Sequence, residues 1–268
     1  MKIALAQMQS TSDLERNLRT MERLTASAAS RGSKMVVFPE MAYFTGHSKE
    51  CPAVARKFPE LMETFASWAR LYNVALLPGT LREPSPQNKQ FNTLPAFGPD
   101  GKLLASYRKI FLFRATLPDR VYDESAYTES GCEPRVFHLD GICFGLSICY
   151  DLRFPELFRC LKKAGADLVF VPAAFTVPTG RAHWETLLKA RAIENQMYVA
   201  APGLVGRSGN GAQTYGHSLV VDPWGKVRPK AANRPTTLTF KYDPDHCASY
   251  RSQLDAWASR REDLFPIR

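Results

Sequence analysis

Short runs of apolar residues alternate with longer amphipathic stretches along most of this chain. Apolar runs of four to eight residues are typical of buried strands, and the stretches between them carry apolar residues at helical spacing. This alternation predicts strands covered by helices, which is an α/β fold in layers. The expected strands are 2–8, 35–38, 74–78, 91–97, 103–107, 142–148, 168–171, 198–201, 218–221 and 236–242, and the expected helices are 14–30, 53–71, 155–164 and 181–196.

Two segments between these elements have distinct characters. The sequence Gly-Pro-Asp-Gly at 98–101 separates two expected strands, and its Pro-Asp-Gly chemistry favours a tight turn. We therefore predict a hairpin there. Over 109–132 the periodicity fails, and a segment of this length without regular structure in a compact domain is usually functional. We predict that it forms an active-site loop.

Length and hydropathy indicate one layered domain. The chain has 268 residues, of which 45% are hydrophobic, so it can bury a sizeable core. We expect a single domain over 1–268, with about 245–268 as a C-terminal extension. No apolar run approaches the roughly 20 residues needed to cross a bilayer, and the amino terminus turns polar too early for a secretory signal. These features predict a cytoplasmic protein without a membrane partner.

Cysteine content and charge exclude two further classes. Six cysteines are scattered through a chain without a secretory signal, which favours free thiols, and no paired CxxC motif supports a structural zinc site. The formal net charge is +9, but basic and acidic residues are mixed and no nucleic-acid recognition signature accompanies them. We predict no nucleic-acid partner, and the excess charge favours an anionic substrate instead.

Cys149 is a candidate nucleophile because of where it lies in the pattern. It directly follows the apolar run ICFGLSI and precedes a polar stretch in which Pro155 is well suited to a helix's first turn. Such a strand-to-helix elbow lifts a side chain out of the sheet and places it near helix amides that stabilise a thiolate. The alternative is that Cys149 is a small buried hydrophobe.

Glu40 occupies the equivalent position after the apolar run MVVFP. The tripeptide Phe-Pro-Glu occurs three times, and the copies ending at Glu60 and Glu156 introduce helical patterns. Those two glutamates are explained as first-turn residues favoured by the helix dipole. Glu40 is followed instead by an aromatic loop with a glycine break, so it is the copy expected over a pocket.

Lys109 leaves an expected strand and enters the apolar run IFLF. Burial of an unpaired ammonium group is costly. If Lys109 is buried there, it needs carboxylate partners.

Three segments carry a family resemblance. MVVFPEMAYF, YRKIFLF and GLSICYDLRFPELFR follow the order and spacing of the Glu, Lys and Cys motifs of the nitrilase superfamily of carbon–nitrogen hydrolases, which the chain resembles. The segments AGADLVFVPAAFTVPTGRAHWETLLKARAIENQMYV and YGHSLVVDPWGKV resemble the Nit branch, which includes omega-amidases and deaminated glutathione amidases. The resemblance runs from the first strand to about Val227.

The resemblance implies a fold and a catalytic set. Members adopt a four-layer αββα sandwich with two central mixed sheets, form homodimers or larger homo-oligomers, and need no cofactor or metal. It implies that Glu40, Lys109 and Cys149 are catalytic and that amide hydrolysis passes through a Cys149 thioester. Many members also have a second glutamate in the loop after the lysine, for which Glu124 is the matching position and Glu129 the alternative.

The Nit branch further implies a small linear amide that carries a distant carboxylate. Deaminated glutathione and the ω-amide of a dicarboxylic acid are the candidates, with carboxylate and ammonia as products. Arg153 and Arg181 are candidate anion partners, although Arg153 could pair with Asp151 or Glu156 and Arg181 could be a solvated first-turn residue. The expected substrate-pocket walls are Tyr43, Phe44, Tyr150 and Phe175.

Other functions stay open at this point. His183 invites a papain-like Cys–His mechanism, but Trp184 and the apolar positions after it have core spacing, which favours packing. Another amide, a nitrile or a carbamoyl compound could be the substrate. A non-catalytic binding protein on the same fold is the remaining alternative, since fold does not fix function.

Overall fold

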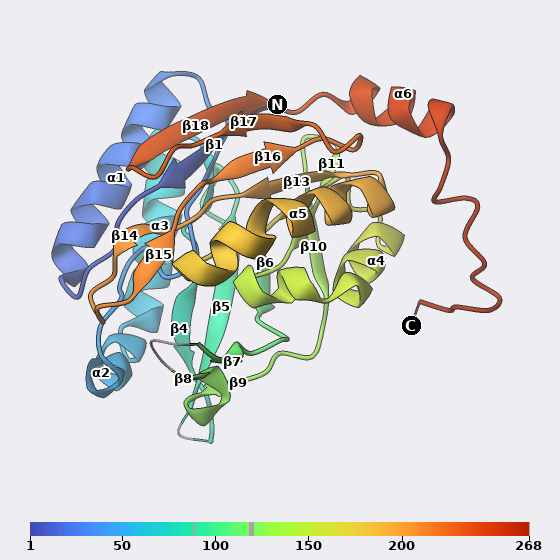
Figure 1. Ribbon diagram of the computed structural model, residues 1–268. Coiled ribbons are helices and arrows are strands. Elements are labelled where there is room, and N and C mark those ends of the chain that lie inside the picture. Colours follow the sequence, from blue (N-terminus) through green and yellow to red (C-terminus); the bar gives the residue numbers. More distant parts are fainter. Residues whose placement is uncertain (88, 118–120, 268) are drawn as a thin grey trace.

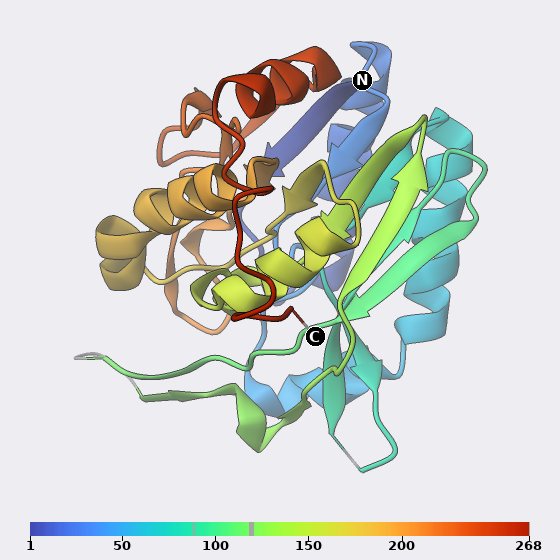
Figure 2. The same cartoon turned by 90° about the vertical axis from the view of Figure 1, so that its right-hand side faces the viewer.

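Two sheets lie face to face in the computed structural model, with helices on the outer side of each (Figures 1 and 2). The structure describes residues 1–87, 89–117 and 121–267. The first sheet has the order β18-β1-β2-β3-β5-β4, and β6 and β9 also pair with β5. Its strands are β1 (Lys2–Gln7), β2 (Met35–Val37), β3 (Ala75–Leu77), β4 (Leu81–Pro84), β5 (Gln90–Phe97), β6 (Leu103–Arg108), β9 (Thr128–Glu129) and β18 (Thr236–Lys241).

The second sheet has the order β10-β11-β12-β13-β16-β17. Its strands are β10 (Arg135–Leu139), β11 (Ile142–Leu146), β12 (Leu168–Phe170), β13 (Tyr198–Ala201), β16 (Leu219–Val221) and β17 (Val227–Lys230). Two small ribbons lie outside both sheets: β7 (Arg114–Thr116) with β8 (Val121–Asp123), and β14 (Val205–Arg207) with β15 (Gln213–Tyr215). The helices are α1 (Leu14–Ser30), α2 (Cys51–Ala55), α3 (Phe58–Tyr72), α4 (Pro155–Lys163), α5 (Val177–Asn195) and α6 (Pro244–Gln253).

The layering follows from strands that are apolar on both faces. In β1, Ile3 and Leu5 join a core cluster that also contains residues of the second sheet, whereas Ala4 and Ala6 join a cluster with α1 and α3. Successive side chains of a strand point to opposite faces, so one short run serves both layers. The helices α4 and α5 cover the other face of the second sheet. The predicted four-layer αββα sandwich is confirmed.

Most predicted elements are present, and the differences have local causes. The hairpin at 98–101 joins β5 to β6 as predicted. The helix expected over 53–71 is instead two helices, because Pro59 lies in the first turn of α3 and its ring would clash with the carbonyl of Ala55 in a continuous helix. The helix expected from 181 begins four residues earlier, at Val177, and Pro178 lies in its first turn.

The segment over 109–132, expected to lack regular structure, contains β7, β8, β9 and the 3-10 helix η2 (Glu124–Ala126). Residues 118–120 of this predicted loop lie outside the described residues. Within the described ranges, none of the helices is both long enough and apolar enough to cross a membrane. The six cysteines are free thiols.

After α6, the C-terminal segment 254–267 returns along the outer helices of the same chain. The Lys163 ammonium group of α4 donates to the Ile267 carbonyl at 2.9 Å and pairs with Glu262 at 2.8 Å. The Trp257 N–H donates to the side chain of Gln196 at 3.0 Å. This segment therefore packs on α4 and on the residue that follows α5.

Candidate active site

Glu40 lies in the turn directly after β2, where β2 and β3 end at the same edge of the sheet. Gly79 approaches the Pro39 carbonyl so closely that a side chain at this position would overlap it. The Thr80 hydroxyl accepts a hydrogen bond from the Met41 N–H at 3.1 Å. These contacts fix the backbone from which the Glu40 carboxylate extends.

Cys149 lies at the predicted elbow. It begins the 3-10 helix η3 (Cys149–Arg153), which connects β11 to α4, and its φ of +48° is in the left-handed region that L-residues rarely adopt. Its N–H donates to the Pro172 carbonyl at 3.0 Å, just beyond β12. The elbow prediction is confirmed, and the conformation turns the thiol out of the strand toward Glu40.

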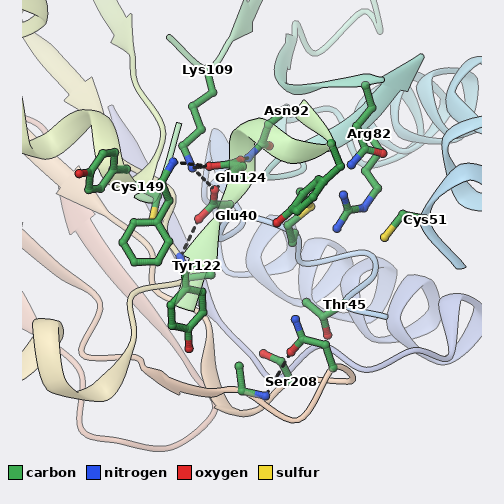
Figure 3. Close-up of a pocket in the computed structure, with 18 of the residues that line it drawn as sticks. Glu40, Thr45, Cys51, Arg82, Asn92, Lys109, Tyr122, Glu124, Cys149 and Ser208 are labelled. Carbon is green, nitrogen blue, oxygen red and sulfur yellow. Dashed lines mark hydrogen bonds and ion pairs between the residues drawn. The ribbon is translucent and has the colours of Figure 1, made fainter. Parts of the chain in front are cut away.

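Lys109 connects two carboxylates (Figure 3). Its ammonium group is 2.9 Å from Glu40 Oε1 and 2.8 Å from Glu124 Oε2. Lys109 is only 2% exposed, so the expectation that a buried ammonium needs carboxylate partners is confirmed. Glu124 also accepts from the Phe113 N–H at 2.8 Å, which connects the η2 segment to the residues that follow Lys109.

Asn92, on β5, is a site residue that the sequence did not single out. Its side-chain amide donates to Glu40 Oε1 at 3.0 Å and to Glu124 Oε1 at 3.1 Å. The available signal was a polar residue inside the strand QFNTLPAF, because buried polar side chains in strands need hydrogen-bond partners. Asn92 therefore holds the same two carboxylates as Lys109.

The charges of Glu40 and Cys149 follow from their contacts. Burial raises the pKa of the Glu40 carboxyl, but the Lys109 charge, the neighbouring Cys149 thiol and hydrogen bonds from Lys109 and Asn92 outweigh it, so the pKa lies below its ordinary 4.5. Burial and the Glu40 charge raise the pKa of the Cys149 thiol well above 9.0, and Lys109 offsets only part of this. The resting pair is a thiol beside a carboxylate.

Lys109 stays a cation within this cluster. Burial lowers the pKa of its ammonium group, but the charges of Glu124 and Glu40 raise it by more, so the net pKa lies well above 10.5. The cluster thus contains one fixed positive charge beside the position where a carbonyl oxygen would gain negative charge.

A cavity of about 880 Å³ opens over these residues. Of the expected walls and anion partners, Tyr150, Arg153 and Phe175 border it. Tyr43 and Phe44, also expected as walls, lie instead in the core cluster shared with α1 and α3, because the turn after Glu40 directs both rings under the sheet.

Arg181 is exposed in the first turns of α5 and does not border the cavity. The structure supports the alternative that Arg181 is a solvated residue near the start of the helix. Farther along α5, Lys189 and Glu185 form an ion pair at 2.7 Å on the helix face.

Arg153 is a cation at the cavity without a carboxylate partner among the described residues. Its guanidinium nitrogens lie 3.3 and 3.4 Å from His183 Nδ1, and its centre is 5.6 Å from the Phe175 ring. Asp151, one of its possible partners, instead accepts from the N–H groups of Ile148 and Phe111 at 2.8 and 3.0 Å. Arg153 is therefore available to an anionic ligand.

The two rival site residues lie elsewhere. His183 is exposed on α5 against Arg153, whereas the Cys149 thiol contacts Glu40, so the geometry does not form a Cys–His pair. Trp184 is buried, and its indole N–H donates to the His217 carbonyl at 2.9 Å, which confirms the packing prediction. Glu129 accepts from the Ser85 hydroxyl, so Glu124 is the second glutamate at Lys109.

A four-layer αββα sandwich with a buried glutamate, lysine and cysteine at the ends of its strands is the arrangement of nitrilase-type hydrolases. A family model described as carbon-nitrogen hydrolase matches residues 2–252, and the chain belongs to this family. The predicted superfamily and enzyme class are confirmed.

Individual relatives and structures agree with the Nit branch. The chain is 38% identical over 266 residues to the deaminated glutathione amidase of Synechocystis sp., covering 96% of this chain and 97% of that one. It is 36% identical over 253 residues to omega-amidase NIT2 of Xenopus tropicalis, covering 94% and 91%. It superposes on the crystal structure of the Caenorhabditis elegans NitFhit protein with a TM-score of 0.93 at 37% identity, over 99% of this chain and 66% of that one.

Proposed function

We propose that this protein is an amidase that hydrolyses a small linear amide through a thioester on Cys149. One observation carries the proposal: a protonated Cys149 thiol lies beside an ionised Glu40 carboxylate, and each shifts the pKa of the other, in a buried site that opens into the cavity. A base in contact with a nucleophile, both shielded from bulk water, is the arrangement that nucleophilic catalysis requires.

In the first half-reaction, Cys149 Sγ attacks the amide carbon and its proton passes to Glu40. The carbonyl oxygen becomes an oxyanion. Lys109 stabilises it, together with the N–H of Tyr150, which has no partner within η3 because it belongs to the helix's first turn. The C–N bond then breaks, Glu40 returns its proton to the leaving nitrogen, and a thioester is formed.

In the second half-reaction, a water molecule gives its proton to Glu40 and attacks the thioester carbon. The C–S bond breaks, the sulfur recovers a proton from Glu40, and the carboxylic acid is released and gives its remaining proton to the solvent. Glu40 acts as base and then acid in each half-reaction, which suits a carboxylate held between two fixed donors. Glu124 does not contact Cys149 and acts as a positioning residue through Lys109.

The substrate class that we propose is an amide whose acyl part carries a distant carboxylate. Arg153 supports this, since its guanidinium has no carboxylate partner among the described residues, borders the cavity and belongs to the same 3-10 helix as Cys149. The names of two relatives point the same way, because a deaminated glutathione and an ω-amide of a dicarboxylic acid both carry such a group. An ω-amide releases ammonia, whereas the amides of deaminated glutathione are peptide bonds and release an amine. The expectation of ammonia therefore applies only to the first.

Several predictions from the sequence and from the family resemblance stand beside this proposal. We keep the homodimer or larger homo-oligomer and the cytoplasmic location as predictions, together with the single domain with its C-terminal extension.

A substrate panel tests the proposed function. We expect the purified protein to hydrolyse glutaramate at least about 10-fold faster in kcat/KM than butyramide, which lacks the distant carboxylate, because a charge pair in a desolvated pocket contributes about 2 kcal/mol or more. Arg153→Gln should remove most of this preference. Arg181→Gln, which changes an exposed arginine of α5 outside the cavity, is the matched control. Acid and ammonia release are measured, and mass spectrometry of quenched enzyme detects the acyl group on Cys149. No release from any amide would favour a non-catalytic binding protein.

A further inference from the structure

A second arginine borders the same cavity on the side away from Cys149. Arg82 lies on β4, next to α2, and Figure 3 shows it with Cys51 across the pocket from the Glu40–Lys109–Cys149 cluster. Arg153, by contrast, lies in η3 beside Cys149 and contacts α5. The cavity therefore has a cation on each side of the nucleophile.

Arg82 is buried without a partner. It is 9% exposed, and its Nε and Nη1 atoms find no hydrogen-bond partner among the described residues. Other buried cations are paired: Lys109 contacts two carboxylates, and Arg191 contacts Glu194 at 3.0 Å and the Leu152 carbonyl at 3.0 Å. A buried guanidinium without a counter-charge is costly, so its retention at a cavity wall indicates a ligand that supplies one.

Three groups whose pKa the Arg82 charge lowers are neutral. They are the phenols of Tyr43 and Tyr127 and the thiol of Cys51. Burial raises the pKa of Tyr43 to about 12 and also raises the pKa of the Cys51 thiol, so neither supplies an anion near neutral pH. The counter-charge is therefore not provided by these neighbours.

The other charges at the cavity lead to the same conclusion. Glu40 and Glu124 are already held by Lys109, and Asp123 accepts from the N–H and hydroxyl of Ser125. Exposed Arg56 and Lys89 add further positive charge to the wall on the Arg82 side. An anion entering this side of the cavity meets an excess of cations.

We propose that Arg82 binds a carboxylate on the amine portion of the substrate, beyond the scissile C–N bond. This inference rests on the proposed function and narrows its substrate class to N-substituted amides with a carboxylate at each end. A primary amide leaves as ammonia and would leave Arg82 without a partner, whereas an amino acid or short peptide as leaving group would bring a carboxylate to it. The planar guanidinium is suited to bidentate binding of that group.

Two substrates with the same acyl part test the proposal. N-glutarylglycine carries a carboxylate on its amine portion, and N-glutarylglycinamide replaces it with a neutral amide of similar size. We expect the wild type to favour N-glutarylglycine at least about 10-fold in kcat/KM. Arg82→Gln should bring this ratio close to one, and Arg82→Lys should restore part of it. Arg70→Gln, which removes an exposed arginine of α3 outside the cavity, is the control.

The outcomes separate this inference from the proposed function. Hydrolysis of glutaramate with no preference for N-glutarylglycine overturns the Arg82 inference and leaves the amidase standing. Absence of hydrolysis of every amide overturns both. A preference that survives Arg82→Gln assigns the carboxylate to another group and also overturns the inference.

A measurement of thermal stability tests whether Arg82 has a structural role. Arg82→Met removes an unpartnered buried charge and keeps a side chain of similar length, so its thermal midpoint should equal or exceed that of the wild type. A marked fall in the midpoint would indicate that the guanidinium holds the fold together, and the inference would then fail. If Arg82→Gln does not fold, the inference is still tested by the wild-type kcat/KM ratio between the two substrates and by how much of that ratio Arg82→Lys retains.

Discussion

The two sides of the cavity differ in how their charges are satisfied. Around Cys149, Lys109 and Asn92 each donate to both Glu40 and Glu124, so two donors hold two carboxylates within one buried network. On the other side, Arg82 is also buried but has no counter-charge among the described residues. The charges around Cys149 are paired before a substrate arrives, whereas Arg82 gains a counter-charge only when a substrate binds.

This difference reflects what each side has to do. Groups that stabilise a developing charge work best when they are held in place before the reaction, because no reorganisation is then needed. Groups that select a substrate must instead stay without a partner until the substrate supplies one. Substitutions in the network around Cys149 should therefore reduce turnover of every amide, whereas substitutions at Arg82 should change which amide is preferred.

The largest effect is expected for the nucleophile. Cys149→Ala should lower turnover of all amides by at least about 10⁴-fold, because no covalent route remains. Cys143→Ala, which removes another buried thiol from β11 in the same part of the chain, should retain most activity. Product release is compared at equal folded concentration, judged by circular dichroism. Substantial turnover by folded Cys149→Ala would contradict the mechanism.

The residues of the network around Cys149 were largely predictable from the sequence, because strand ends carry a clear sequence signal. Glu40 and Cys149 each follow an apolar run, and the two similar Phe-Pro-Glu segments proved to be first turns of α3 and α4. Lys109 was identified by its position before an apolar run, which implied buried partners. These inferences need only the order of residues along the chain.

The residues inside strands were not predictable in this way. Asn92 and Arg82 lie opposite each other across the β4–β5 pairing, and which face each presents depends on a register that the sequence does not state. Tyr43 and Phe44 were misplaced for a related reason, since a turn can direct an aromatic ring into the cavity or under the sheet. Three-residue strands such as β7 are too short to produce a periodic pattern.

The next largest effect on turnover is expected for Glu124, one of the two carboxylates that hold Lys109. Glu124→Gln keeps the side-chain size but removes one of two charges on Lys109, so we expect turnover to fall on the order of 10²-fold. Loss of one partner of a buried ion pair should also lower the free energy of unfolding by about 3 kcal/mol. Glu129→Gln, in the same segment but bonded to Ser85, is the matched control. Equal rates for both variants would remove Glu124 from the network.

The smallest effect is expected in the pH dependence of kcat/KM, which again distinguishes the network around Cys149 from Arg82. The pKa of Glu40 is held below 4.5 and that of Cys149 well above 9.0, so kcat/KM should be nearly flat between these values. Below that window Glu40 gains a proton and can no longer accept one from Cys149, so the rate falls.

Asn92 is one of the donors that keep the pKa of Glu40 low, since its amide hydrogen bond favours the ionised carboxylate. Asn92→Leu should therefore move the acid limb of the pH–rate profile to higher pH. Arg82→Gln should leave that limb in place, because among the described residues Arg82 makes no hydrogen bond or ion pair with Glu40 and lowers instead the pKa of Tyr43, Cys51 and Tyr127. A shift of the limb in Arg82→Gln as large as in Asn92→Leu would mean that the two sides of the cavity form one electrostatic unit, and the distinction between them would fail.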